Sequence, residues 1–344
     1  NGDRRRKRLV RFLFFQENNR RSKKALSLAG ALIPILFLFI GRCQGEAIAM
    51  IDTRETAERL RDHVRTLTVT IGERSMLQPE NLEKARLYIE SFYQDLGLPV
   101  EGQFYQYGDI RVGNVISRID AVEDPSNRFL VGAHYDSVGG TVGADDNAAA
   151  IAVQLETARA LMRSPGGLKA GTSVKFVSFT LEEPPTFATR YMGSRVYARD
   201  ARGRREKLDG MICLEMVGYY RDQPGSQSYP FPLMFMNYPK EGNFIGIVGN
   251  SKSRGLTRSL EQAFRKNPHL PVISLTVPLN GWLMPPVRLS DHSAFWDEGY
   301  QAVMVTDSAF YRNPHYHLPS DTMDKLDFRR MAELVKSLLI FLGP

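Results

Sequence analysis

Six side chains of the types that bind metal ions are spread along this chain in a fixed order. They are His134, Asp146, Glu182, Glu183, Glu215 and His317. Zinc accepts neutral imidazole and carboxylate ligands, and a paired site needs one histidine for each ion and one carboxylate that bridges the two ions. Two histidines and four carboxylates meet that requirement and leave one acid free. The set therefore predicts a centre that holds two Zn²⁺ ions.

Five members of the set have an expected place as ligands. Asp146 is the natural bridge between the two ions. His134 and Glu215 would complete the coordination of one ion. Glu183 and His317 would complete the coordination of the other.

The remaining acid, Glu182, is free to act as a general base. It would take a proton from the attacking water, whose pKa the ions lower, and later give a proton to the leaving amine. Asp136 lies two residues after His134, where it can accept the second ring N–H of that histidine and fix the orientation of the ring. We expect these groups together to hydrolyse a peptide bond.

Taken singly, each of these signals is weak. A histidine followed two residues later by an aspartate is usually a structural hydrogen bond, because buried polar groups need partners. The pair Glu182–Glu183 alone is typical of a solvated surface, and Asp145-Asp146-Asn147 alone is typical of a helix N-cap. The signals gain weight because they occur together, at the ends of strand-like runs.

The elements that must position these residues alternate between helix and strand. Helical spacing of apolar residues predicts helices at 53–70, 79–97, 147–163, 188–200, 253–266, 291–298 and 327–342. Apolar runs predict strands at 111–119, 128–134, 173–181, 210–217 and 301–306. Uninterrupted runs such as 174–181 are typical of a sheet covered by helices on both faces. We therefore predict a three-layer α/β/α domain with a mixed, mostly parallel central sheet.

The candidate ligands lie where such a fold places functional groups. In open α/β sheets these groups gather at the carboxyl ends of strands, where loops begin. His134 and Glu215 lie at or near the ends of two apolar runs, and Glu182 follows a third. Asp146 precedes a helical stretch, and His317 follows the last strand by a short loop. We expect these segments to converge on one crevice.

Composition and charge limit the class of protein. The 344 residues are 43% hydrophobic and 24% charged, as expected for one large α/β domain with an extension. The formal net charge of +7 comes from the N-terminus, since residues 1–42 hold eleven Lys/Arg against two Asp/Glu and the rest of the chain holds 34 against 36. Because the body is close to neutral, nucleic acid is not an expected partner.

Residues 1–50 are predicted to be a targeting tail, and residues 51–344 a catalytic domain. A basic stretch precedes an uncharged apolar run of 17 residues at 25–41. This run is long for the core of a signal peptide and short for a membrane-spanning helix. Ala47-Ile48-Ala49 matches a signal-peptidase site, whereas an uncleaved segment would anchor the protein in the membrane with its basic end in the cytoplasm. In both cases we expect the body to be exported, to the periplasm or the outside of the cell.

The two cysteines, Cys43 and Cys213, are too few for a disulfide framework or a cysteine-based zinc site. Cys43 follows the apolar run as a lipid-anchored cysteine would, but Arg42 stands where a small residue is expected, so lipidation is not predicted. Any metal ion must therefore be held by histidine and carboxylate.

Six segments carry a resemblance to a known family. They are 134–137 (HYDS), 143–147 (GADDN), 181–185 (LEEPP), 214–219 (LEMVGY), 290–292 (SDH) and 316–322 (YHLPSDT). They resemble the dizinc aminopeptidases that include bacterial leucyl aminopeptidase and aminopeptidase Y, and the similarity covers residues 55–342. The resemblance implies a zinc-exopeptidase fold, two zinc ions and peptide substrates. It also implies Asp146 as the bridge and Glu182 as the base.

The same resemblance indicates a substrate pocket. The segment 290–295 resembles the start of a helix beside that pocket, so Ser290, Asp291 and His292 are expected to contact substrate. Phe310 is expected to form a hydrophobic wall. Many relatives have a glycine-rich turn after the glutamate pair, where this chain has 184–187 (PPTF), and the substrate preference therefore stays open.

Three other functions stay open. Glutaminyl cyclases resemble this fold but hold one zinc ion, because the positions that match His134 and Glu215 do not ligate. Deacylases and carboxypeptidases with a dimerisation lid have a similar ligand order, but they space the first histidine and the bridging aspartate farther apart, and 216–300 leaves little room for their inserted domain. A catalytically inactive, membrane-tethered interaction protein is the third alternative. The oligomeric state stays unknown.

Overall fold

The computed structural model describes residues 51–121, 124–231, 234 and 236–344. The predicted tail, residues 1–50, lies outside the described residues, together with its apolar run. Residues 51–344 form one compact unit. Within the described part of the chain, no helix has both the length and the apolar character needed to cross a membrane.

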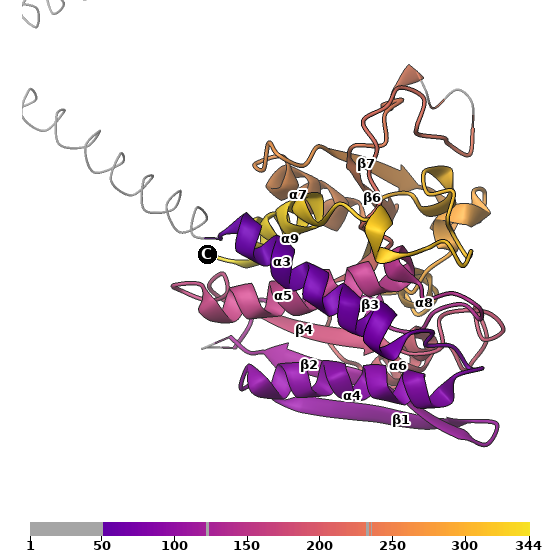
Figure 1. Cartoon of the computed structure of the whole chain (residues 1–344). Coiled ribbons are helices and arrows are strands. Elements are labelled where there is room, and N and C mark those ends of the chain that lie inside the picture. Colours follow the sequence, from indigo (N-terminus) through magenta and orange to yellow (C-terminus); the bar gives the residue numbers. More distant parts are fainter. Residues whose placement is uncertain (1–50, 122–123, 232–233, 235) are drawn as a thin grey trace, which may run out of the picture. The chain divides into compact units, whose positions relative to one another are not determined.

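A mixed sheet of eight strands runs through this unit from β1 to β7 in the order β1-β2-β4-β3-β5-β8-β6-β7 (Figure 1). The strands are β1 Val100–Tyr107, β2 Ile110–Ile119, β3 Asn127–His134, β4 Thr172–Phe179, β5 Gly210–Glu215, β6 Ile245–Asn250, β7 Val272–Val277 and β8 Ala302–Thr306. The central strands β4, β3, β5 and β8 are parallel, whereas β2 and β6 pair antiparallel with β4 and β8. Four of the seven pairings in the described sheet are parallel, as a mixed and mostly parallel sheet requires.

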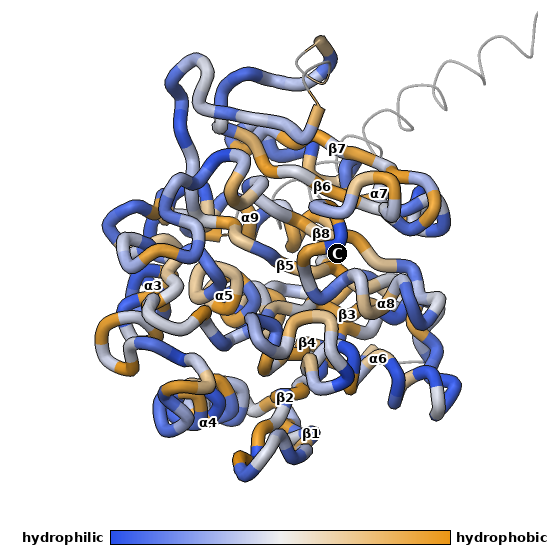
Figure 2. Tube along the Cα trace, turned by 90° about the vertical axis from the view of Figure 1, so that its right-hand side faces the viewer, coloured by the Kyte–Doolittle hydropathy of each residue, from blue (hydrophilic) through white to orange (hydrophobic). Residues whose placement is uncertain are grey.

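Helices cover the sheet on both faces, as Figure 2 shows. Their bounds are α3 Thr53–Arg65, α4 Pro79–Asp95, α5 Ala150–Arg163, α6 Gly193–Gly203, α7 Arg254–Phe264, α8 His292–Asp297 and α9 Phe328–Leu342. On one face α3, α5 and α9 pack against one another, and α5 lies on β3 and β5. On the other face α6 packs against α8, which lies on β5 and β8. The prediction of a three-layer α/β/α domain is confirmed.

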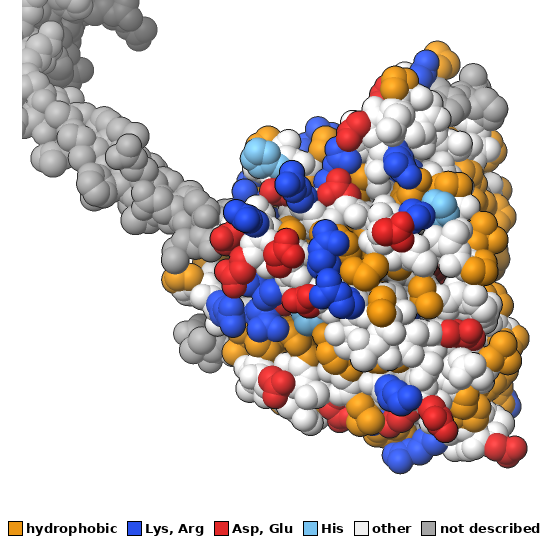
Figure 3. All heavy atoms as spheres, in the orientation of Figure 1, with side chains coloured by type: hydrophobic (Ala, Val, Ile, Leu, Met, Phe, Trp, Pro, Cys, Tyr) orange, Lys and Arg blue, Asp and Glu red, His pale blue; other side chains and the backbone are white. Residues whose placement is uncertain are grey.

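The sequence explains why the central strands are the most buried part of the molecule. Every residue of β5 and β8 is buried, because both strands are apolar up to Glu215 and Thr306 at their carboxyl ends and helices cover both of their faces. The edge strand β1 instead alternates half-buried and exposed residues. On the outer face of α3, Lys and Arg side chains lie among Asp and Glu (Figure 3), and pairs such as Arg65–Asp62 join them along the helix.

Three strands were missed by the sequence prediction. β1, with the sequence VEGQFYQY, has Glu101, Gln103 and Gln106 between its apolar residues and lies at the edge of the sheet, so it lacks the apolar run that marks a buried strand. β6 and β7 have six residues each, and β6 contains two glycines. Glycine has low strand propensity, which hides this strand from pattern recognition.

Two predicted helices have different bounds in the structure. The helix expected at 188–200 begins only at Gly193, because residues 186–192 form turns in which Thr189 N–H donates to the Thr186 carbonyl. The helix expected at 147–163 begins at Ala150, because Asp146 and Asn147 have non-helical backbone angles. The first change leaves the residues after the glutamate pair in turns, and the second leaves Asp146 outside the regular α-helix.

Candidate metal centre

The structure brings all six predicted metal-site side chains together. His134 Nε2 lies 3.3 Å from Asp146 Oδ1 and 3.4 Å from Glu215 Oε2. His317 Nε2 lies 3.2 Å from Asp146 Oδ2 and 3.2 Å from Glu183 Oε2. The two oxygens of Asp146 therefore face two different histidines, which is the arrangement that a bridging carboxylate needs.

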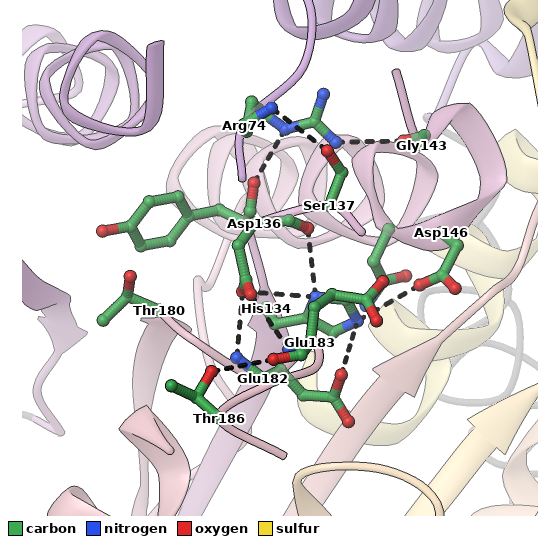
Figure 4. Close-up of polar contacts among 12 residues, drawn as sticks. Arg74, His134, Asp136, Ser137, Gly143, Asp146, Thr180, Glu182, Glu183 and Thr186 are labelled. Carbon is green, nitrogen blue, oxygen red and sulfur yellow. Dashed lines mark hydrogen bonds and ion pairs between the residues drawn. The ribbon is translucent and has the colours of Figure 1, made fainter. Parts of the chain in front are cut away.

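The sixth side chain, Glu182, lies beside this cluster. Its Oε2 is 3.8 Å from His134 Nε2, and it lines the same small pocket as Asp146, Glu183 and His317. Figure 4 shows Glu182 and Glu183 below His134, with Asp146 to the right of His134. Glu182 is thus close to the ligands without being needed to complete either set.

Strand ends and sharp turns place these side chains. His134 is the last residue of β3 and Glu215 the last residue of β5, and these strands are neighbours in the sheet. Three non-glycine residues at the site have left-handed backbone: Leu181 (φ 58°) before the glutamate pair, Met216 (φ 45°) after Glu215, and His317 itself (φ 57°). Such conformations are costly for residues with a Cβ atom and are concentrated at functional sites.

Gly143 makes the turn that carries Asp146. Its φ is +51°, and a Cβ atom at this position would lie 2.1 Å from the backbone oxygen of Asp146 and 2.8 Å from Cβ of Ser137. Only glycine fits there. The glycine of the segment GADDN is therefore required so that the chain can fold back and direct Asp146 at the cluster.

Asp136 has a broader part than the sequence predicted. His134 Nδ1 lies 3.2 Å from the backbone oxygen of Asp136 and 3.5 Å from its carboxylate, so the carbonyl is the nearer acceptor. The carboxylate itself accepts the backbone N–H groups of Glu182 at 3.1 Å and Glu183 at 3.0 Å. Asp136 therefore holds the backbone of the glutamate pair as well as the ring of His134.

Asp321 is a positioning residue that the sequence reasoning did not single out. Its carboxylate accepts the backbone N–H groups of Asp145 and Asp146 at 3.0–3.2 Å. Asp145 in turn accepts Gly218 N–H at 2.8 Å. Asp321 lies four residues after His317, within the segment YHLPSDT, and that position was the only signal available.

The electrostatics of the cluster call for cations. Burial alone would lower the pKa of His317, but hydrogen bonds with Asp146 and Glu183 raise it to about 10. Burial and the charge of Asp146 raise the pKa of Glu183 to about 8, and burial raises the pKa of Glu182 well above its usual value. Crowded, buried carboxylates take up protons unless a cation compensates them, and a divalent ion does so directly.

Two buried atoms of the cluster without a hydrogen-bond partner are a further reason why these side chains fit zinc. His134 Nε2 and Glu183 Oε1 are buried and make no hydrogen bond, although buried polar atoms normally have a partner. Ligand atoms of His134, Asp146 and Glu215 lie within 4.8 Å of one another, and so do those of Asp146, Glu183 and His317. Imidazole and carboxylate groups in this spacing are ordinary zinc ligands.

The predicted substrate residues Ser290, Asp291 and His292 are not at the pocket surface. All three are fully buried. Ser290 Oγ donates to Glu215 at 2.6 Å, and His292 Nε2 lies 2.8 Å from the carbonyl oxygen of Val287. None of the three lines either pocket at the site. The start of α8 packs against the cluster through Ser290, and the expectation that these three residues contact substrate stays a prediction.

Phe310 does line a pocket. An apolar pocket of about 110 Å³ extends from Glu215 and Tyr316 over β6 and β7. Phe310 is 41% exposed, and its ring centroid lies 5.4 Å from that of Tyr316. Of the described lining residues, Glu215 at the cluster end is the only one with a charge. The floor includes Val248, Leu275 and Met284, which the sequence prediction missed together with the two strands.

The fold and the clustered ligands are those of a metallopeptidase. The chain belongs to peptidase family M28, because the sequence model of that family matches residues 114–341. The resemblance to dizinc aminopeptidases is thereby confirmed at the level of the family.

Two relatives by sequence differ in their identity to this chain and in how much of it they cover. The uncharacterized protein YfbL of Escherichia coli (strain K12) is 37% identical over 293 residues, which cover 83% of this chain and 87% of that protein. Leucine aminopeptidase 1 of Trichophyton rubrum is 27% identical over 222 residues, 62% of this chain. The match spans 52% of the fungal protein, about half its length.

Solved structures share the fold. LapB from Legionella pneumophila has a TM-score of 0.62 at 21% identity and covers 86% of this chain and 72% of its own. BSAP, a zinc aminopeptidase from Bacillus subtilis, has a TM-score of 0.61 at 15% identity, with 84% and 95% covered. The glutaminyl cyclase of Porphyromonas gingivalis has a TM-score of 0.60 at 17% identity, with 83% and 96% covered.

Proposed function

We propose that this protein is a zinc-dependent aminopeptidase that removes N-terminal residues from peptides. The observation that carries the proposal is the position of Asp146 between two histidines, with one oxygen directed at each. That arrangement divides the ligands into two overlapping sets and supports two zinc ions. In the set of His134 and Glu215, and in the set of Glu183 and His317, Asp146 is the shared member.

The residues of the chain have separate tasks in this proposal. When bound, the ions supply Lewis acidity and lower the pKa of the attacking water. Glu182 would take the proton of that water as the new C–O bond forms, and would then give a proton to the leaving amine as the C–N bond breaks. Asp136 holds the backbone of Glu182 in place.

The apolar pocket supports a preference for an apolar first residue. It opens beside the cluster at Tyr316 and Leu289, which also line the metal-site pocket. A charged side chain would lose its hydration there without gaining a partner. The substitution Leu275→Asp, at the pocket floor, should lower kcat/KM for leucyl substrates and improve the relative rate for lysyl ones. Leu283→Asp is the matched control, because Leu283 is 67% exposed and lines no part of the pocket.

The central test is Glu182→Gln. Because the substitution removes the proton acceptor and keeps the size of the side chain, turnover of an aminoacyl-anilide should fall by about 10²–10⁴-fold while zinc content stays unchanged. Glu206→Gln is the control, since Glu206 pairs with Lys175 away from the site. A Glu182→Gln protein that turns over at the wild-type rate would refute the assigned base.

A panel of substrates separates the alternatives. Aminoacyl-anilides report aminopeptidase action, blocked peptides report endopeptidase action, and N-acyl or C-terminal substrates report deacylase or carboxypeptidase action. Peptides with N-terminal glutamine report cyclisation, which releases ammonia. A purified protein that binds less than one zinc equivalent and is inactive on the whole panel would favour the alternative of a catalytically inactive interaction protein.

We further propose export of the domain 51–344. The basic stretch followed by the apolar run at 25–41 supports this localisation. A fusion of residues 1–50 to a reporter that is active only after export tests it. A reporter that stays in the cytoplasm would overturn the proposal.

A further inference from the structure

One arginine next to the metal centre is used in an unusual way. Arg74 is fully buried, and its guanidinium lies within hydrogen-bond distance of five backbone oxygens, three of which share the two N–H groups of Nη1. The acceptors, at 2.7–3.1 Å, are the carbonyl groups of Leu67, Gly72, Tyr135, Val142 and Gly143. In the described chain it forms no ion pair with a carboxylate within 4.0 Å. Among the described residues, the Arg74 side chain therefore binds backbone carbonyl groups and no carboxylate.

Three of these acceptors lie on the loop that joins two proposed ligands. Tyr135 directly follows His134, and its carbonyl accepts from Nε at 2.7 Å. Val142 and Gly143 lie just before the turn that carries Asp146, and they accept from Nη1 at 2.7 Å and Nη2 at 3.0 Å. One rigid, planar guanidinium thus spans both ends of the loop 135–143.

The backbone of Arg74 adds to this hold. Its N–H donates to Ser137 Oγ at 3.1 Å, and Ser137 N–H donates to the carbonyl of Arg74 at 3.4 Å. Ser137 Oγ also donates to the carbonyl of Thr141 at 3.2 Å. Figure 4 shows Arg74 above Asp136 and His134, with its contacts reaching to Ser137 and Gly143. The middle of the loop is therefore fixed as well as its two ends.

Arg74 also brings charge to a region rich in carboxylates. Burial lowers its pKa to about 10, against the raising effect of nearby Asp136, Asp321 and Asp146, so the group stays protonated near neutral pH. A fixed cation at this position offsets part of the repulsion among the carboxylates of the centre. Arg74 lies before residues 114–341, which match the family, so this contribution comes from the N-terminal part of the domain.

We infer that Arg74 is a positioning residue of the metal centre, which fixes the loop 135–143 and thereby the spacing between His134 and Asp146. The inference rests on the proposed function, in which these two residues share one zinc ion with Glu215. Loss of the guanidinium should weaken that ion more than the one held by Glu183 and His317. The reason is that this ion takes two ligands, His134 and Asp146, from the two ends of the loop, whereas the other ion takes only Asp146 from it.

Zinc affinity of the full-length protein tests the inference. Dissociation constants for both ions are measured by competition with a chromophoric chelator, for wild type, Arg74→Met, Arg74→Lys and Arg312→Met. Arg312 is the matched control, because it is also buried and donates to the backbone carbonyls of Tyr219 and Phe244. Melting temperatures without metal are recorded in parallel.

Arg74→Met should weaken one of the two zinc ions by about tenfold or more, which is the usual loss when a residue that orients ligands is removed. Arg312→Met should lower the melting temperature and leave both zinc affinities within about twofold of wild type. Arg74→Lys keeps the charge but cannot reach both ends of the loop, so it should give an intermediate loss. If Arg74→Met does not fold, Arg74→Lys decides, with a loss of about threefold or more expected.

Two results would overturn the inference. One is zinc binding by the Arg74 variants that equals wild type at both sites. The other is an equal loss in Arg74→Met and Arg312→Met, which would mean general destabilisation. Failure of the proposed function looks different, because wild-type protein itself would then bind no zinc stoichiometrically.

Discussion

The two halves of the metal centre are built from different parts of the fold. His134 and Glu215 end the neighbouring strands β3 and β5, and the side chain of His134 is completely buried. Glu183 and His317 come from loops, and the side chain of His317 is 29% exposed. The sheet therefore fixes the first pair, whereas loops outside the sheet fix the second. We call them the strand-held half and the loop-held half.

This difference predicts different energetics for the two halves. Buried groups that pair inside the protein are costly to leave unpaired, whereas exposed pairs contribute little to stability. The strand-held half should thus be coupled to folding, and the loop-held half mainly to ion exchange and turnover.

The largest effect is expected from removal of the histidines. His134→Ala and His317→Ala should each lower turnover by about 10⁴-fold or more, because each removes a proposed zinc ligand. Without metal, His134→Ala should lower the free energy of unfolding by about 3–5 kcal/mol, since it leaves buried carboxylates without their partner. His317→Ala should lower it by less than His134→Ala does, because the side chain of His317 is 29% exposed and its charge interactions are partly screened. Urea unfolding measures both values, and equal losses would remove the distinction between the halves.

Metal removal should occur in two steps. A chelator is expected to take the ion of the loop-held half first, because His317 is accessible and His134 is not. At zinc concentrations about 1,000 times the dissociation constant, each ion adds about 4 kcal/mol to the stability of the folded state. Zinc content, activity and melting temperature followed over time would show the steps. A single concerted loss of both ions would contradict the expected order.

An ion cluster away from the centre offers a comparison for acid sensitivity. Glu156 accepts from His63 at 3.0 Å and Arg59 at 2.6 Å. Burial alone would raise its pKa, but these hydrogen bonds lower it from 4.5 to about 2. A lowered pKa contributes stability that is present above pH 4.5 and is lost as the pH falls towards 2.

Glu156→Gln should therefore lower the free energy of unfolding by about 3 kcal/mol at pH 7 and have little effect near pH 2. Zinc affinity should not change, because Glu156 lies between α3 and α5, away from the ligands. Unfolding curves at several pH values measure the free energy of unfolding, and zinc titrations at pH 7 measure the zinc affinity. A change in zinc affinity would show that this cluster and the centre are coupled.

The smallest effect is expected at Tyr316. Its ring stacks on His317 with a centroid distance of 3.8 Å and an angle of 19°. Tyr316→Leu removes an aromatic contact of about 1 kcal/mol, so the loop-held ion should bind about fivefold more weakly. Tyr316→Phe keeps the stacking and should bind zinc as wild type does. Equal zinc affinities in wild type, Tyr316→Leu and Tyr316→Phe would show that stacking does not support His317.

The elements predicted best from the sequence are those with a strong and continuous pattern. The helix predicted at 79–97 is α4, Pro79–Asp95, and the strand predicted at 128–134 is β3, Asn127–His134. The apolar pocket could not be predicted, because its floor lies on β6 and β7, whose short runs carry no clear period. The burial of His292 was equally hidden, since a motif gives spacing along the chain and not the depth at which a helix packs.

The sequence by itself determined the types and order of the metal-binding side chains, and the strand ends that carry His134 and Glu215. It could do so because both depend on local pattern: apolar runs make strands, and parallel strands present their carboxyl ends at one edge. Only the tertiary structure decided that Asp146 faces two histidines and that Arg74 holds the loop between two ligands. Those contacts join residues far apart in the chain, and their distances follow from how layers pack, which no local pattern encodes.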